Sequence, residues 1–154
     1  MAQADREKWD RLHAQRVEPA EPPAWLAEHA ACLPRTGRAL DIAAGAGRIA
    51  IWAAARGLDV LAVDLPGVGL ARISHPRVRT LERDLEEDPR LPEGPFELVT
   101  LFHYRQPSLA APVHAALAPG GYLLAELATL TNLERHAHPS RRWLAEPGEL
   151  LRFA

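Results

Sequence analysis

The sequence of 154 residues has one cysteine (Cys32), one lysine and one asparagine, and it contains no long apolar run. A single cysteine excludes a framework of internal disulfide bonds and is typical of a reducing compartment. No apolar stretch approaches the roughly 20 residues that a membrane-spanning helix needs. The opening residues, MAQADREKWDR, are charged and lack the apolar core of a secretory leader. We therefore expect a cytoplasmic protein without a membrane segment.

Neither sign of charge dominates, because the sequence has 20 acidic and 18 basic residues and a net charge of −2. The chain lacks the overall basic field that nucleic-acid-binding proteins present to phosphates. Its apolar content of 47% and charged content of 25% are those of an ordinary globular protein. We expect a single domain over 1–154, with an N-terminal helical segment (1–36), a ligand-binding βαβ core (37–128) and a segment (129–154) with a polar loop and a last helix.

Short apolar segments with strand-like composition alternate with segments of helical length. Strands are expected at 39–43, 59–63, 78–82, 96–102 and 121–127. Helices are expected at 1–16, 24–31, 47–56, 66–73, 108–118 and 147–153. Strands separated in this way predict an α/β fold, with a Rossmann-like doubly wound parallel sheet and helices on both faces.

The segment Arg38 to Arg56, RALDIAAGAGRIAIWAAAR, joins a predicted strand to a predicted helix through a loop of small residues. Glycines at 45 and 47 let the backbone approach a ligand closely, because no Cβ intervenes. The free N–H groups at the start of the helix point at the same place. Asp64 ends the next strand, 19 residues after Gly45. A glycine turn followed by such an acid predicts a nucleoside-binding βαβ unit.

Two kinds of nucleoside ligand fit this pattern. Gly45 to Ala50 matches the G-x-G-x-x-A fingerprint of dinucleotide folds, so an NAD(P)-binding oxidoreductase is one reading. That reading lacks a visible catalytic pair of the Tyr-x-x-x-Lys type, since Lys8 is the only lysine. Three other features favour a different ligand: Asp41 inside the first strand, Asp84 after the third, and Pro119-Gly120-Gly121 before the fifth.

Together these features resemble class I S-adenosylmethionine-dependent methyltransferases, and most closely small bacterial members of the tellurite-resistance-type branch. The resemblance runs from about Trp9 to Leu151. It rests on Ala39 to Ala50, Asp59 to Asp64, Asp84-Leu85, Phe96 to Val99 and Ala118 to Gly121. It implies S-adenosylmethionine as cofactor, methyl transfer to a small-molecule acceptor and a C-terminally shortened fold with sheet order 3-2-1-4-5. A non-catalytic, cofactor-binding subunit is the other reading.

In such families the Asp41 position and the glycine loop hold the methionine part of the cofactor. The Asp64 position binds the ribose hydroxyls, and the Asp84 position binds the adenine amino group. The resemblance therefore implies cofactor contacts from Asp41, Ala43, Gly45, Gly47, Arg48, Asp64, Leu65, Asp84 and Leu85. The residues alone leave alternatives open. Asp64 can be a helix N-cap, Asp84 part of a solvated acidic loop, and Arg48 an exposed first-turn residue.

The acceptor is expected beyond the fourth strand, at His103-Tyr104-Arg105. His103 suits a general base, because imidazole titrates near neutral pH. Tyr104 suits contact with the sulfonium or the substrate, and Arg105 suits an anionic substrate. We take His103 and Tyr104 as the catalytic candidates. The alternative is that both side chains only end the strand and bond to the backbone.

Three further expectations concern the periphery. His136-x-His138, with His114 and Cys32, matches no zinc-ligand spacing, so no metal site is predicted. Trp9 and Trp25 suit either packing or a lid over the cofactor. The fifth strand ends the sheet, and an unprotected edge invites aggregation. We expect that edge to be covered by the C-terminal segment or paired in a homodimer.

Overall fold

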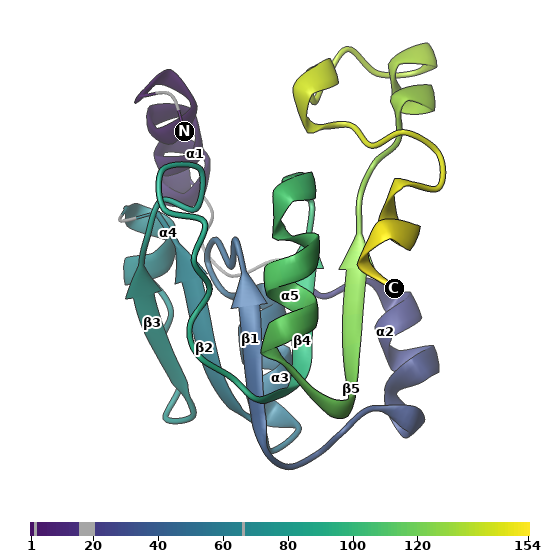
Figure 1. Cartoon of the computed structure of the whole chain (residues 1–154). Coiled ribbons are helices and arrows are strands. Elements are labelled where there is room, and N and C mark those ends of the chain that lie inside the picture. The colour runs from purple at the N-terminus through teal and green to yellow at the C-terminus, as the bar shows by residue number, and fades with distance from the viewer. Residues whose placement is uncertain (2, 16–20, 66) are drawn as a thin grey trace.

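The computed structural model describes residues 1, 3–15, 21–65 and 67–154, and one parallel sheet runs through its centre (Figure 1). The strands are β1 (Arg38–Ile42), β2 (Asp59–Asp64), β3 (Val78–Glu82), β4 (Phe96–Phe102) and β5 (Leu117–Glu126). Their order is β3-β2-β1-β4-β5, and every neighbouring pair is parallel. The predicted fold class and strand order are confirmed.

Helices cover both faces of the sheet (Figure 1). The α-helices are α1 (Gln3–Gln15), α2 (Ala24–His29), α3 (Arg48–Ala55), α4 (Val68–Ala71) and α5 (Ala110–Ala116). Short 3₁₀ helices are η1 (Ala30–Cys32), η2 (Pro107–Leu109), η3 (Leu130–Glu134), η4 (Arg141–Trp143) and η5 (Glu149–Phe153). None of the described helices is long and apolar enough to cross a membrane.

Each face of the sheet has its own apolar core, because successive strand side chains point to opposite faces. In β1, Leu40 and Ile42 face the core formed with α5, and Ala39 faces the core formed with α3 and α4. The alanines of α3 lie close to the strands because they have no long side chain. The segment 83–95 forms no helix or strand and contributes Leu85 to the α5 face.

Several element boundaries differ from the prediction near β5. The strand begins at Leu117 rather than at 121, and its pairing with β4 is irregular between Phe96 and Leu98. The predicted last helix is a 3₁₀ helix that begins after Gly148, whose φ is +82°. By contrast, β3 and β4 have the predicted bounds.

The C-terminal segment pairs with the chain just beyond β5. Thr129 and Ala145 form an isolated parallel bridge, and the Ala145 amide donates to the Ala128 carbonyl at 2.9 Å. The strand β5 itself lies at the edge of the sheet. The C-terminal segment that was predicted to cover the edge of β5 therefore pairs with the residues that follow this strand. The homodimer alternative stays a prediction.

Candidate active site

The loop between β1 and α3 turns through three left-handed residues. Ala43, Gly45 and Gly47 have φ of +56°, +57° and +88°, and Ala43 is one of two non-glycine residues with positive φ among those described. A Cβ on Gly47 would lie 2.7 Å from the Ile73 side chain, so this position requires glycine for both space and backbone. Arg48 then begins α3, whose first amides have no side-chain cap from Gly47.

Asp64 ties this loop to the end of β2. Its Oδ2 accepts a hydrogen bond from the Gly45 amide at 2.6 Å, and its Oδ1 accepts one from the Leu65 amide at 2.7 Å. Burial raises the pKa of Asp64, whereas the two amides and His13 lower it, and the net shift is upward. The predicted N-cap alternative is wrong, because α4 begins later, at Val68, whose amide donates to Asp10 instead.

Asp41 lies inside the sheet beneath the loop. It pairs in register with Thr100 of β4, whose hydroxyl donates to Asp41 Oδ1 at 2.7 Å. The Ala50 amide lies close enough to this carboxyl to lower its pKa, but Oδ2 is buried and makes no hydrogen bond of acceptable geometry among the described residues. Burial raises the pKa of Asp41 to about 7, against the lowering effect of the Thr100 hydroxyl. A buried acceptor with no partner is costly unless a donor satisfies it, so this atom fits a cationic group of a ligand.

Asp84 follows β3 and is mostly buried, so it does not belong to a solvated loop. Its Oδ2 accepts a hydrogen bond from the Met1 ammonium at 3.0 Å, and its Oδ1 accepts one from the Glu86 amide at 3.0 Å. Burial by itself would raise the pKa of Asp84. The Met1 ammonium and the Glu86 amide together lower it by more, so the net shift is downward. Asp84 thus holds a donor at the end of β3, where the adenine amino group is expected.

A small cavity brings six of the predicted residues together. It is lined by Ala43, Asp64, Leu65, Asp84, Leu85 and Tyr104, and by Met1 and Arg83. Gly45 and Gly47 belong to the adjoining loop. Arg48 lies close enough to both Asp41 and His103 to affect their pKa values, and its guanidinium donates to the Glu21 carbonyl at 3.4 Å.

The helix α1 lies across this end of the sheet, beside α4 (Figure 1). The His13 ring lies 3.2 Å from where a Cβ on Gly45 would stand. Trp9 stacks on His13 with ring centroids 6.1 Å apart. Trp25 lies elsewhere, stacked on Phe102 at the end of β4. Of the two tryptophans predicted for packing or a lid, only Trp9 therefore lies near the glycine loop.

The two catalytic candidates differ in their surroundings. His103 has φ of +57°, and its Nε2 lies 3.1 Å from Glu126 Oε1. Burial lowers the pKa of His103, Glu126 raises it and Arg48 lowers it, with a net downward shift that favours the neutral imidazole. Tyr104 is buried, and its hydroxyl donates to Gln106 at 2.7 Å. Burial raises the pKa of Tyr104, so its phenol stays neutral and serves contact rather than proton transfer.

Arg105, the residue predicted to bind an anionic substrate, already has an anionic partner in the structure. Its Nε and Nη2 donate to Glu149 at 2.7 and 3.0 Å, a bidentate pair that fixes η5 to the end of β4. Glu149 is only 4% exposed, and Arg105 lowers its pKa. The guanidinium therefore serves the fold.

Replacing Arg105 with alanine should lower the free energy of unfolding by about 3–5 kcal/mol, because the buried Glu149 carboxylate would lose its charged partner. Urea unfolding of the variant measures the change. Arg141→Ala, at an exposed arginine of η4, is the matched control and should leave stability nearly unchanged. Equal stability of Arg105→Ala and the control would contradict the assignment.

Four residues at the site were missed by the sequence analysis. Thr100 and Glu126 contact the predicted residues across the sheet, and His13 and Asp10 contact the site from α1. Thr100 shows no signal in the sequence, whereas Glu126 is an acid at the end of an apolar strand and offered one. Within the described part of the chain, no three His, Cys, Asp or Glu side chains gather as metal ligands.

A sheet of order 3-2-1-4-5, with a glycine loop after β1 and acids after β2 and β3, defines a Rossmann-like fold of the class I methyltransferase kind. The chain belongs to the methyltransferase-domain family, whose model matches residues 12–153. No curated protein matches the chain in sequence.

Solved structures agree with this family. An S-adenosylmethionine-dependent methyltransferase from Mesorhizobium loti is 30% identical over 67% of this chain, with a TM-score of 0.55. This chain spans 53% of that protein's length. A TehB-like S-adenosylmethionine-dependent methyltransferase from Corynebacterium glutamicum is 23% identical over 96% of this chain and 77% of its own, with a TM-score of 0.61.

A third structure, 1,6-didemethyltoxoflavin-N1-methyltransferase from Burkholderia thailandensis, was solved with bound 1,6-didemethyltoxoflavin and S-adenosylhomocysteine. It is 24% identical over 82% of this chain and 60% of its own, with a TM-score of 0.60. Its likeness to this chain concerns the fold. The family assignment favours the methyltransferase reading of the glycine loop over the dinucleotide one.

Proposed function

We propose that the chain is an S-adenosylmethionine-dependent methyltransferase that acts on a small-molecule acceptor. The observation that carries the proposal is the buried, unpartnered Oδ2 of Asp41 beneath a left-handed glycine loop. A dinucleotide brings an anionic pyrophosphate to such a loop, and a pyrophosphate has no N–H donor for this oxygen. The cofactor's α-ammonium is instead a donor with positive charge. The M. loti relative supports the same cofactor.

Each end of the cofactor has a partner of suitable charge. Its ammonium would bind Asp41, and its carboxylate would bind the first amides of α3 and the Arg48 guanidinium. Asp64 would accept the two ribose hydroxyls. Both of its oxygens already accept an amide, but each has a second lone pair for a further donor. Asp84 would accept the adenine amino group in place of the Met1 ammonium, with Leu65 and Leu85 beside the ring.

When bound, the cofactor supplies a methyl group on a positively charged sulfur. The chain's own contribution is to align the acceptor with that group, since in-line displacement depends mostly on positioning. His103 stands at the end of β4, next to the end of β1, where it can take a proton from the acceptor. Tyr104 lines the cavity and excludes water from it.

We also propose a single domain and a dimer for this chain. The whole chain would act as one domain, in which 1–36 precede and 129–154 follow the 37–128 core in the sequence. A second copy paired along the edge of β5 would complete the hydrogen bonding of that strand. The near balance of charge favours a small acceptor over a nucleic acid.

S-adenosylhomocysteine should raise the melting temperature of the protein, and NAD should not. A ligand at 100 times its Kd stabilises the folded state by about 2.7 kcal/mol, which corresponds to a shift of several degrees in a domain of this size. Differential scanning fluorimetry with both ligands measures this. A shift with NAD alone would overturn the proposal. Binding of S-adenosylhomocysteine without turnover of any acceptor would instead support the non-catalytic subunit.

A further inference from the structure

His103 belongs to a chain of three hydrogen-bonded side chains at the carboxyl ends of β4 and β5. Its Nε2 lies 3.1 Å from Glu126 Oε1, and its backbone amide donates to the Glu126 carbonyl at 2.8 Å. The Trp25 indole N–H donates to the other oxygen, Glu126 Oε2. Glu126 therefore bonds to both the backbone and the ring of His103 while a third residue holds the carboxylate.

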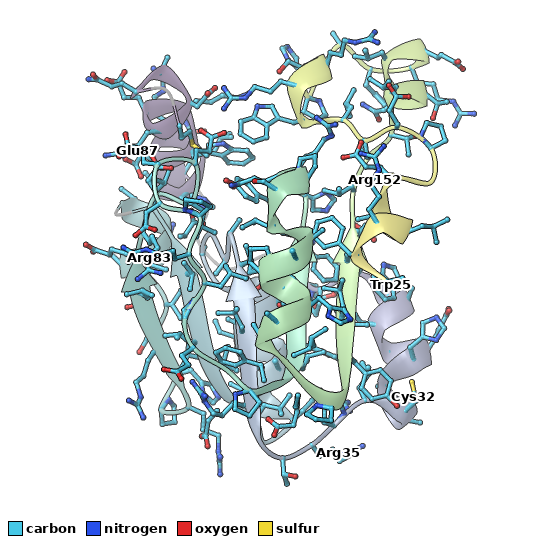
Figure 2. The ribbon with its side chains drawn as sticks, viewed as in Figure 1. Trp25, Cys32, Arg35, Arg83, Glu87 and Arg152 are labelled. Atoms are coloured by element: carbon cyan, nitrogen blue, oxygen red, sulfur yellow. The ribbon has the colours of Figure 1, made fainter. Side chains whose placement is uncertain are left out.

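The far end of this chain of side chains is packed against the sheet. Trp25 comes from α2 beside β5 (Figure 2), and its ring stacks on Phe102 with centroids 5.7 Å apart and an interplanar angle of 14°. Phe102 and the neighbouring Leu26 are buried in the small core between α2 and the sheet. This packing orients the indole, and its N–H in turn orients the Glu126 carboxylate.

The backbone of His103 is strained at the same place. Its φ of +57° is rare for a residue with a Cβ, and Ala43 is the other such residue in the described part of the chain. The two positions follow β4 and β1, which are neighbouring strands, so both strained residues border the glycine loop. Strain of this kind persists where the surrounding structure enforces it, and it is concentrated at functional sites.

A carboxylate on one imidazole nitrogen fixes the state of the other. Glu126 accepts only, so Nε2 carries the proton in the neutral ring and Nδ1 has the lone pair. The charged groups near His103 are Glu126 on β5 and Arg48 at the start of α3. The His103 side chain is half exposed, so a substrate can approach the ring from solvent. After protonation, Glu126 stabilises the imidazolium.

We propose that Glu126 is a positioning residue for His103, and that the acceptor is therefore a molecule whose reacting atom carries a hydroxyl or N–H proton. This inference rests on the proposed methyl transfer. The acceptor's oxygen or nitrogen bonds to the methyl carbon while the carbon–sulfur bond breaks and its electron pair goes to sulfur. The acceptor's proton goes to His103 Nδ1 and then to solvent. An acceptor without a proton has no need of this arrangement.

The direct test is the titration of His103 by NMR, which needs no acceptor. In the wild type, ring nitrogen shifts should show the Nε2–H tautomer, and Glu126→Gln should lower the pKa of His103 by about 1 pH unit. Glu126→Asp should retain much of the effect. Glu134→Gln, at an exposed carboxylate of η3, is the control and should change neither measurement. An Nδ1–H tautomer in the wild type, or an unchanged titration in Glu126→Gln, would overturn the proposal.

Activity supplies the second readout. With catechol as a protic acceptor, Glu126→Gln should lower kcat about 10–100-fold with KM little changed, and it should shift the acidic limb of the pH–rate profile. Dimethyl sulfide, which has no proton to lose, should be methylated no better by the wild type than by Glu126→Gln. A Glu126-dependent rate with dimethyl sulfide would overturn the proposal.

The binding of S-adenosylhomocysteine separates the two levels of inference. Isothermal titration should give the same Kd for the wild type and Glu126→Gln, because Glu126 lies outside the cofactor cavity. If the wild type binds no S-adenosylhomocysteine, the proposed function fails. If S-adenosylhomocysteine binds but the pKa of His103 is the same in the wild type and in Glu126→Gln, only the positioning role fails.

Discussion

Replacing Asp41 with asparagine should flatten the pH dependence of stability. Burial raises the Asp41 pKa from 3.8 to about 7 in the folded protein, so the folded state holds this proton more tightly than the unfolded chain does. Its contribution to stability is fully present below about pH 4 and is lost as the pH rises through about 7. A shift of this size corresponds to at most about 4 kcal/mol. Asparagine carries no such proton.

Urea unfolding of the wild type and of Asp41→Asn between about pH 4.5 and about pH 7.5 measures this effect. Other groups titrate in both proteins, so the difference between the two curves isolates Asp41. Asp59→Asn is the matched control, because Asp59 has a side chain that is 69% exposed at the start of β2. Parallel curves for the wild type and Asp41→Asn would show that Asp41 is ionised in the folded protein.

The order of strands could be predicted because each strand has a local signal. The apolar residues 96–102 and the strand 78–82 are flanked by charged or proline-rich segments, which fixed both ends. The boundary between α5 and β5 has no such signal. Leu117 joins the strand by pairing with Phe96 of β4, which lies much earlier in the sequence.

The cofactor half of the site was predictable for a related reason. The end of each parallel strand meets the same edge of the sheet, so Asp64 and Asp84 come together once the strands are placed. Contacts between the ends of the chain and the core could not be foreseen. Met1 contacts Asp84 across 83 positions, and the helix that carries His13 has no buried residue of its own to mark its place.

In the acceptor half of the site, the charge of a residue and its place in the sequence were not enough to predict its partner. Arg105 stands next to His103 and Tyr104 in the sequence, which suggested a substrate contact. Its partner Glu149 is 44 positions away, in the C-terminal segment that this ion pair joins to the end of β4. Glu126 was missed for the converse reason, because its partner is set by the β4–β5 register rather than by spacing along the chain.

Replacing Asp64 with asparagine should raise the Kd for S-adenosylhomocysteine about 100-fold, if the proposed site is right. A hydrogen bond to a charged group contributes about 1.5–3 kcal/mol, and the ribose would lose two charge-assisted bonds. About 3 kcal/mol corresponds to a factor of about 100. The variant keeps the size of the side chain, but its amide NH2 cannot accept the Gly45 or Leu65 amide as a carboxylate oxygen does, so the effect on the loop needs its own test.

Asp64 also holds the glycine loop through the Gly45 amide. Binding of two nucleosides distinguishes recognition of the ribose hydroxyls from this effect on the loop. The wild type should bind adenosine more tightly than 2′-deoxyadenosine, and Asp64→Asn should bind the two about equally. Isothermal titration with both ligands measures this, with Asp59→Asn as control. If Asp64→Asn raises the Kd of both nucleosides by the same factor, Asp64 orders the glycine loop and does not recognise the sugar. The reason is that a carboxylate can discriminate between the two ligands only through the hydroxyl that one of them lacks.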